Sequence, residues 1–88
     1  MPVNKREFYE AQAKTIIKGL REDKNLSYKE LARRLASVGV VIDVQVLINR
    51  INAGKFSFTF ALQLLAAMDV DSIEVPRLPA PRPAKKVK

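Results

Sequence analysis

The sequence predicts an all-α fold, with four amphipathic helices in one compact domain over residues 1–75 and a disordered basic tail over residues 76–88. Three observations support this prediction. Apolar residues recur at three- and four-residue spacing, which is the period of one helix face. A capping side chain precedes each of the four stretches. Four of the five prolines follow position 75, where they prevent a further helix.

The first helix is predicted to begin at Asn4, where Glu7 completes a capping box, and to end at residues 23–25. Its apolar stripe includes Phe8, Ile16 and Leu20. Lysines and arginines occupy the other faces, so the helix is amphipathic and packs by a single side.

Capping residues and glycines mark the ends of the second and third predicted helices. Ser27 and Glu30 form a second capping box, and Gly39 stops the second helix. Asp43 caps the third helix, which ends at Gly54. The apolar run 40–42 between them is too short and isolated for a sheet, so we expect a linker tucked against the core.

Ser57 caps the fourth helix, whose buried set is expected to be Phe60, Ala61, Leu64, Leu65 and Met68. After Val70 the periodicity fades, which leaves open one further helical turn, a fifth helix, or a short extended stretch. From Pro76 onward the density of proline and the lack of apolar residues to bury predict a disordered tail.

The composition removes several classes of function. Cysteine and histidine are both absent, which excludes disulfides, thiol nucleophiles, Ser-His and Cys-His triads and the commonest zinc ligands. The carboxylates are scattered, so we expect neither an enzyme nor a metal or cofactor site. The sequence shows no signal-peptide core and no membrane-length apolar run, so we expect a cytoplasmic protein.

The net charge of +7 is unevenly distributed. Residues 57–75 carry three acids and no bases, whereas residues 76–88 carry five bases and no acids. A basic body with a basic tail favours polyanions, first nucleic acid and second an anionic membrane that the first helix could contact. A merely solubilising cationic surface is the alternative.

The third helix carries residue types that read DNA. Gln45 and Asn49 lie four apart on its outer face, and Arg50 follows Asn49. Glutamine and asparagine can pair with adenine, and arginine with guanine, in the major groove. Simple solvation of three polar side chains is the alternative. A helix-turn-helix needs such an outer face on its second helix, and apolar inner faces on both helices.

Three segments, 27–35 (SYKELARRL), 48–55 (INRINAGK) and 62–70 (LQLLAAMDV), together resemble the Cro/C1-type, lambda-repressor-like helix-turn-helix family. The chain is also similar to a group of small bacterial proteins that share the same Leu-Ala and Gly-Lys-Phe-Ser motifs, a likeness that names no function. The family resemblance implies base reading by one set of residues, namely Gln45, Val46, Asn49 and Arg50. It implies phosphate contacts by Tyr28, Lys29 and Lys55. We also expect phosphate contacts by Ser27, at the N-terminus of the second helix, and by Arg21 and Arg33.

Two features depart from the family pattern. The link between the second and third helices is about six residues longer than the family's tight turn, so the third helix can sit at a different angle. The family's glutamate before the final glycine is Asn52 here. Arg21 therefore lacks its usual partner, and we expect it to be free to bind phosphate.

The tail offers further contacts with DNA. Residues 81–86 (PRPAKK) resemble arms that enter the minor groove, although they lack the glycine of an AT-hook. The plainer reading is a solubilising tail that adds non-specific phosphate contacts. The tail residues expected to contact DNA are Arg77, Arg82, Lys85, Lys86 and Lys88.

These patterns predict a duplex-DNA-binding protein of the nucleoid, acting as a bacterial or phage transcriptional regulator. A homodimer is expected because one short helix reads too few base pairs. Val46 and residues 40–42 are candidate self-association patches, and Phe56 or Phe58 could be exposed for a dimer contact. The alternatives are a nucleoid-associated protein that coats DNA with little specificity and a helical protein-interaction module.

Overall fold

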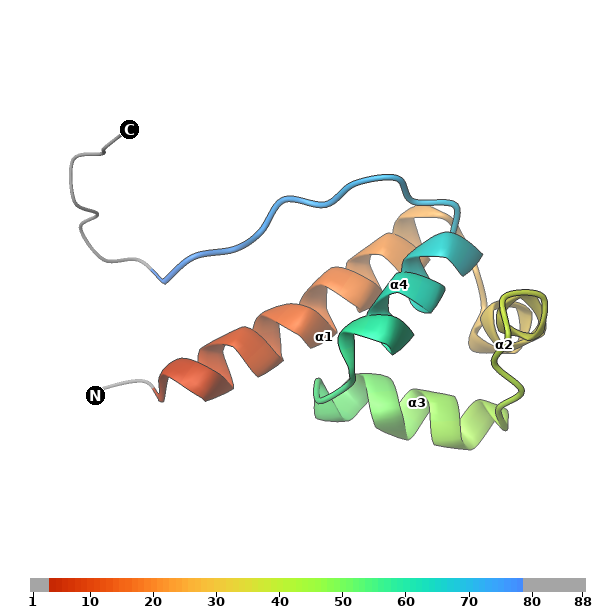
Figure 1. Ribbon diagram of the computed structural model, residues 1–88, viewed down its shortest axis with the longest axis horizontal. Coiled ribbons are helices and arrows are strands. Elements are labelled where there is room, and N and C mark those ends of the chain that lie inside the picture. The colour runs from red at the N-terminus through yellow and green to blue at the C-terminus, as the bar shows by residue number, and fades with distance from the viewer. Residues whose placement is uncertain (1–3, 79–88) are drawn as a thin grey trace.

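The computed structural model describes residues 4–78, which form four helices and, within that range, no strand (Figure 1). The helices are α1 (Lys5–Asp23), α2 (Tyr28–Ala36), α3 (Val44–Ala53) and α4 (Phe58–Ala67). The predicted all-α fold with four helices is confirmed. Residues 70–78 are not helical, so no fifth helix forms in the part of the chain that is described. The remainder of the predicted disordered tail, residues 79–88, lies outside it.

Each helix begins after the cap that the sequence predicts. In all four cases a side-chain oxygen of the capping residue accepts a hydrogen bond from a backbone N–H in the first turn, over 2.9 to 3.4 Å. The capping residues are Asn4, Ser27, Asp43 and Ser57. Each such cap contributes about 1 kcal/mol by satisfying a donor that the helix itself leaves open.

The core lies where the helices meet, and it is built mainly by α2, α3 and α4. Among the described residues no buried side chain is polar. Helix α1 supplies one buried residue, Ile17, and serves mainly as a support for α3. The buried side chains are Ile17, Leu26, Leu31, Leu35, Leu47, Ile51, Phe60, Leu64, Ala67 and Met68.

The link between α2 and α3, residues 37–43, is fixed on the core. Val40 and Ile42 pack against the buried cluster as predicted, whereas Val41 between them is 95% exposed. The Gln63 amide of α4 donates to the Val38 carbonyl at 3.0 Å and ties the link to α4. In Figure 1 α2 is seen end-on and α3 from the side, so the two helices cross steeply.

Gly54 ends α3 and brings it against α1. Its φ of 67° is left-handed, and a Cβ at this position would overlap the Glu10 carbonyl oxygen of α1. Glycine is required both for the backbone conformation and for the close approach of the two helices. The position of α3 on the scaffold therefore depends on this residue.

Residues 70–78, here called the return segment, run back along α1 and α4 (Figure 1). Ile73 and Pro76 help to line an apolar groove of about 180 Å³ with α1 and the start of α4. The segment therefore covers the side of α4 that faces α1.

Helix α1 is the longest helix, with 19 residues, and charged side chains are spread along its length. Across residues 4–78, no helix combines the length and the apolar character that crossing a membrane requires.

Candidate nucleic-acid interface

The exposed face of α3 carries a pair of amide side chains. Gln45 Nε2 donates a hydrogen bond to Asn49 Oδ1 at 3.0 Å, and both residues are exposed. Val46 lies on the same side of the helix and is 46% exposed. Leu47 and Ile51 are fully buried on the opposite side, which holds this face toward solvent.

This hydrogen bond determines which donor and acceptor groups of the two amides are free to bind a ligand. It uses one Gln45 N–H, which leaves the Gln45 carbonyl oxygen as an acceptor and the Asn49 amino group as a donor. Adenine shows a neighbouring acceptor and donor, N7 and the N6 amino group, in the major groove. The pair is thus complementary to this base edge, and it is ordered before binding, which lowers the entropic cost.

Arg50 lies apart from this pair. Its guanidinium is stacked over the Phe60 ring, 4.9 Å from the ring centre. The side chain is exposed, and a cation–π contact of this kind is worth about 0.5 to 1 kcal/mol. The structure therefore holds Arg50 toward α4, whereas the sequence suggested a place beside Asn49.

The start of α2 presents an exposed cap and an exposed lysine. Ser27 and Lys29 are both exposed, and the first N–H groups of α2 point out of the same end of the helix. Tyr28 is partly buried because Arg21 covers its ring. Lys55, immediately after α3, is also exposed. Oriented N–H groups and ammonium groups are suited to binding phosphate.

The expectation that Arg21 is free was wrong. Its Nη1 donates to the Leu26 carbonyl at 2.7 Å, and its guanidinium lies 4.1 Å from the centre of the Tyr28 ring. Only 19% of the side chain is exposed. A backbone carbonyl and an aromatic ring have taken the place of the missing glutamate, so Arg21 holds the α1–α2 turn to the start of α2.

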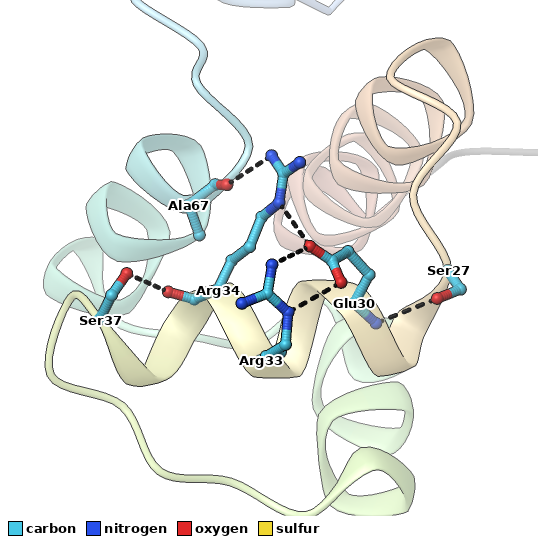
Figure 2. A network of polar contacts seen from close by, with 6 residues as sticks. All are labelled: Ser27, Glu30, Arg33, Arg34, Ser37 and Ala67. Carbon is cyan, nitrogen blue, oxygen red and sulfur yellow. Dashed lines mark hydrogen bonds and ion pairs between the residues drawn. The ribbon is translucent and has the colours of Figure 1, made fainter.

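Arg33 is part of an ion-pair cluster on α2 (Figure 2). Glu30 accepts hydrogen bonds from Arg33 Nε at 2.9 Å and from Arg34 Nε at 3.1 Å. Arg33 was predicted to contact phosphate. Its side chain is 72% exposed, but one carboxylate compensates the two arginines, so the cluster has a net charge of +1.

Arg34 has a role that the sequence reading missed. Its Nη1 donates to the Ala67 carbonyl at 3.4 Å, so it joins α2 to the last turn of α4 (Figure 2). The spacing of Glu30 with Arg33 and Arg34, three and four residues apart, could have revealed the cluster, because residues so spaced are neighbours on a helix. The contact with α4 depends on the tertiary fold.

The cluster predicts a dependence of stability on pH. Hydrogen bonds from Arg33, and then from Arg34, lower the pKa of Glu30 from 4.5 to about 2. The unfolded chain therefore binds more protons between these values, so the stabilisation by Glu30 is complete above about pH 4.5 and is lost as the pH falls toward 2. Thermal unfolding across this range should show wild type more stable than Glu30→Gln at pH 6, with the difference vanishing near pH 2. A difference that stays constant with pH contradicts the prediction.

One of the tail residues predicted to contact DNA lies within the described residues. Arg77 is exposed in the return segment. Arg82, Lys85, Lys86 and Lys88 lie outside the described residues.

Within residues 4–78 no three carboxylates, cysteines or histidines gather into a group that could hold a metal ion. The α3 amides can form hydrogen bonds with a ligand, and the exposed Lys29 and Lys55 can pair with negative charges.

The comparison with known proteins gives one result. Residues 9–73 match the profile of a domain of unknown function, DUF6471. No curated protein and no solved structure matches the chain. The matched range includes α2, α3, α4 and most of α1. Because the match covers well over half of the 88 residues, the chain belongs to the DUF6471 family.

Proposed function

We propose that this protein binds duplex DNA with α3 in the major groove. It acts in the nucleoid as a bacterial or phage transcriptional regulator. The observation that carries the proposal is the hydrogen-bonded pair of Gln45 and Asn49 on the exposed face of α3. α3 has a buried inner face and follows α2 at a steep angle, as a helix that reads a groove requires.

The surrounding cations support the same mode of binding. Lys29 at the start of α2 and Lys55 after α3 are the exposed lysines closest in sequence to the ends of the two helices that would meet the duplex. Ammonium groups at these positions bind phosphate and set the register of α3, while carrying little sequence information themselves. The partial positive charge at the α2 N-terminus adds to them.

The long link between α2 and α3 is compatible with this role. Val40 and Ile42 anchor it on the core, and Gln63 holds the Val38 carbonyl, so α3 is held in one orientation. A reading helix must be rigid because each base contact depends on placement to within a fraction of an ångström. The extra length changes the path of the chain without loosening the helix.

Coating of DNA without sequence preference is the second candidate. It is favoured by the net charge of +7 and by the five bases of residues 76–88. Such binding rests on phosphate contacts alone and needs no paired amides.

A titration of a fluorescent duplex at two salt concentrations, with and without competitor DNA, tests the proposal. We expect binding at low salt, weakening as salt rises, and incomplete displacement by unrelated duplex. Equal displacement by every duplex supports coating. Absence of binding at low salt rejects both DNA functions and leaves a protein-interaction module.

Deletion of residues 76–88 should reduce the salt dependence of binding. The tail carries five cations, and each phosphate contact contributes about 0.9 to the slope of log affinity against log salt. We expect a fall in that slope of up to about four, together with weaker binding to every duplex. An unchanged slope shows that the tail makes no phosphate contacts.

A further inference from the structure

Helix α4 leaves one apolar face without a partner. Phe58 is 78% exposed and Leu62 is 51% exposed, and Ala66 continues the same line one turn further on. These three residues, spaced four apart, are called the α4 stripe. α4 carries only two polar side chains, the exposed Thr59 and the half-buried Gln63, so the α4 stripe is an exposed apolar patch of the kind that marks an interface.

The other sides of α4 are already occupied. Phe60 and Leu64 are buried in the core, and Ala61 and Leu65 line the groove that the return segment covers. The helix contains no charged residue, in contrast to α1, α2 and α3. Charged and amide side chains, which cover most of the exposed faces of the other helices, are absent from the α4 stripe.

DNA is a poor occupant for the α4 stripe. Residues 57–75 contain three acids and no bases, and Asp69 and Asp71 are exposed at the C-terminal end of α4. Phosphate would be repelled there, and an apolar stripe offers it no hydrogen bonds. The α4 stripe is therefore distinct from the α3 face that suits the duplex, and Lys55 lies in the chain between the two.

We propose that the α4 stripe is a self-association surface, on which a second copy of this chain packs with its α4 antiparallel to the first. In a two-fold dimer a residue on the axis contacts the same residue of the partner. Any other contact occurs twice, because residue i contacts residue j of the partner and residue j contacts residue i of the partner. Antiparallel pairing places Leu62 against Leu62, and it places the large Phe58 of each copy against the small Ala66 of the other.

The shape of the surface fits this pairing. A hollow of about 400 Å³ lies beside Ala66, lined by Leu62, Leu65, Ala66, Asp69, Val70 and Asp71. The hollow is open to solvent on one side, so the Phe58 ring of a second copy can approach it from outside. The projecting ring and the hollow lie at opposite ends of the α4 stripe, as antiparallel pairing requires.

The charges at the two ends of α4 also favour antiparallel pairing. Lys55 is exposed just before α4, and Asp69 and Asp71 are exposed just after it, where the neighbouring Lys24 offsets one of these two acids. Antiparallel pairing brings the basic end of one helix toward the acidic end of the other, whereas parallel pairing brings like charges together. Opposite charges at the two ends therefore favour the antiparallel dimer.

The size of the surface sets the strength of the dimer. A standard interface buries about 800 Å² on each partner, which is more than three side chains and a shallow hollow supply. The dimer is therefore weak and forms at high protein concentration. It is independent of DNA, so it can be tested without assuming the proposed function.

Sedimentation velocity of the full chain without DNA, from low micromolar to several hundred micromolar, tests the proposal. We expect wild type to pass from monomer to dimer. Leu62→Glu should weaken the dimer at least about 100-fold, because it sets two carboxylates against each other in an apolar contact. Val41→Glu and Val46→Glu, which place the same charge on other exposed apolar residues, should dimerise like wild type.

A second variant keeps the test decisive if Leu62→Glu unfolds. The chain has no cysteine, so Leu62→Cys should oxidise to a covalent dimer through one defined bond, and it should do so much faster than Val41→Cys at the same protein concentration. A monomeric wild type at every concentration overturns the proposal. Dimerisation that survives Leu62→Glu, or that is lost in Val41→Glu or Val46→Glu, also overturns it, whatever the outcome of DNA-binding experiments.

Discussion

Gly54→Ala is expected to lower the free energy of unfolding by about 3 kcal/mol. The left-handed φ of 67° costs an alanine about 1 to 2 kcal/mol. The added Cβ must also displace the Glu10 carbonyl, a backbone group of α1 that cannot rotate away. Urea unfolding followed by circular dichroism at 222 nm, the usual helix signal, measures the loss.

The other two glycines provide matched controls. Gly19→Ala, in the interior of α1 with nothing near its Cβ position, should stabilise the protein by about 0.5 to 1 kcal/mol. Gly39→Ala has a positive φ but only an ordinary contact with Gln63, so we expect a loss of about 1 to 2 kcal/mol. If Gly54→Ala were no worse than Gly39→Ala, the close packing of α3 on α1 would be incorrect.

Asn49→Ala is expected to remove most of the discrimination between a preferred duplex and a scrambled one. A good pair of hydrogen bonds to a base edge is worth about 1 to 3 kcal/mol of discrimination, or about five- to 150-fold. The variant also frees Gln45, which loses the hydrogen bond that orders it. Fluorescence anisotropy with the two duplexes at one salt concentration measures the ratio of affinities.

Removal of phosphate contacts should lower the affinity and its salt dependence without changing the discrimination between the two duplexes. Lys29→Gln combined with Lys55→Gln should weaken binding to both duplexes equally and lower the salt slope by about two. Lys24→Gln removes one charge and is the control for each of the two lysine substitutions made singly, because the Lys24 ammonium donates to the Asp69 carbonyl just after α4. If Asn49→Ala lowered both affinities equally, α3 would not be the reading helix.

The sequence was sufficient to predict the structural features that depend on residues close together in the chain. All four caps and the glycine at the end of α3 were predicted correctly, because a cap is decided by a few adjacent residues. The three- and four-residue spacing of apolar residues likewise predicted amphipathic helices, and Leu31, Leu35, Leu47 and Ile51 are the buried residues of α2 and α3. These residues then fix which side of α3 is exposed.

The sequence was insufficient where a side chain chooses between partners in space. Arg21 was expected to be free, yet it binds a carbonyl and a ring that the α1–α2 turn brings to it. Arg50 was placed beside Asn49 but lies over Phe60 of the next helix. Long cationic side chains reach several neighbours, so their contacts follow from the packing of the helices and not from spacing alone.

The exposed face of α4 was visible only in the fold. Periodicity marked Phe60, Leu64 and Met68 as buried, and they are. It left open which of Phe56 and Phe58 is exposed. The packed fold decides this, because Phe56 lies beside the groove and Phe58 projects into solvent.

Selection of bound fragments from random duplex DNA tests the central claim most directly. The wild-type protein should enrich a short motif, arranged as two inverted half-sites if the dimer forms on DNA, and Asn49→Ala should enrich none. Recovery of no duplex above background at low salt, or a motif that survives Asn49→Ala unchanged, would contradict the claim that α3 reads DNA.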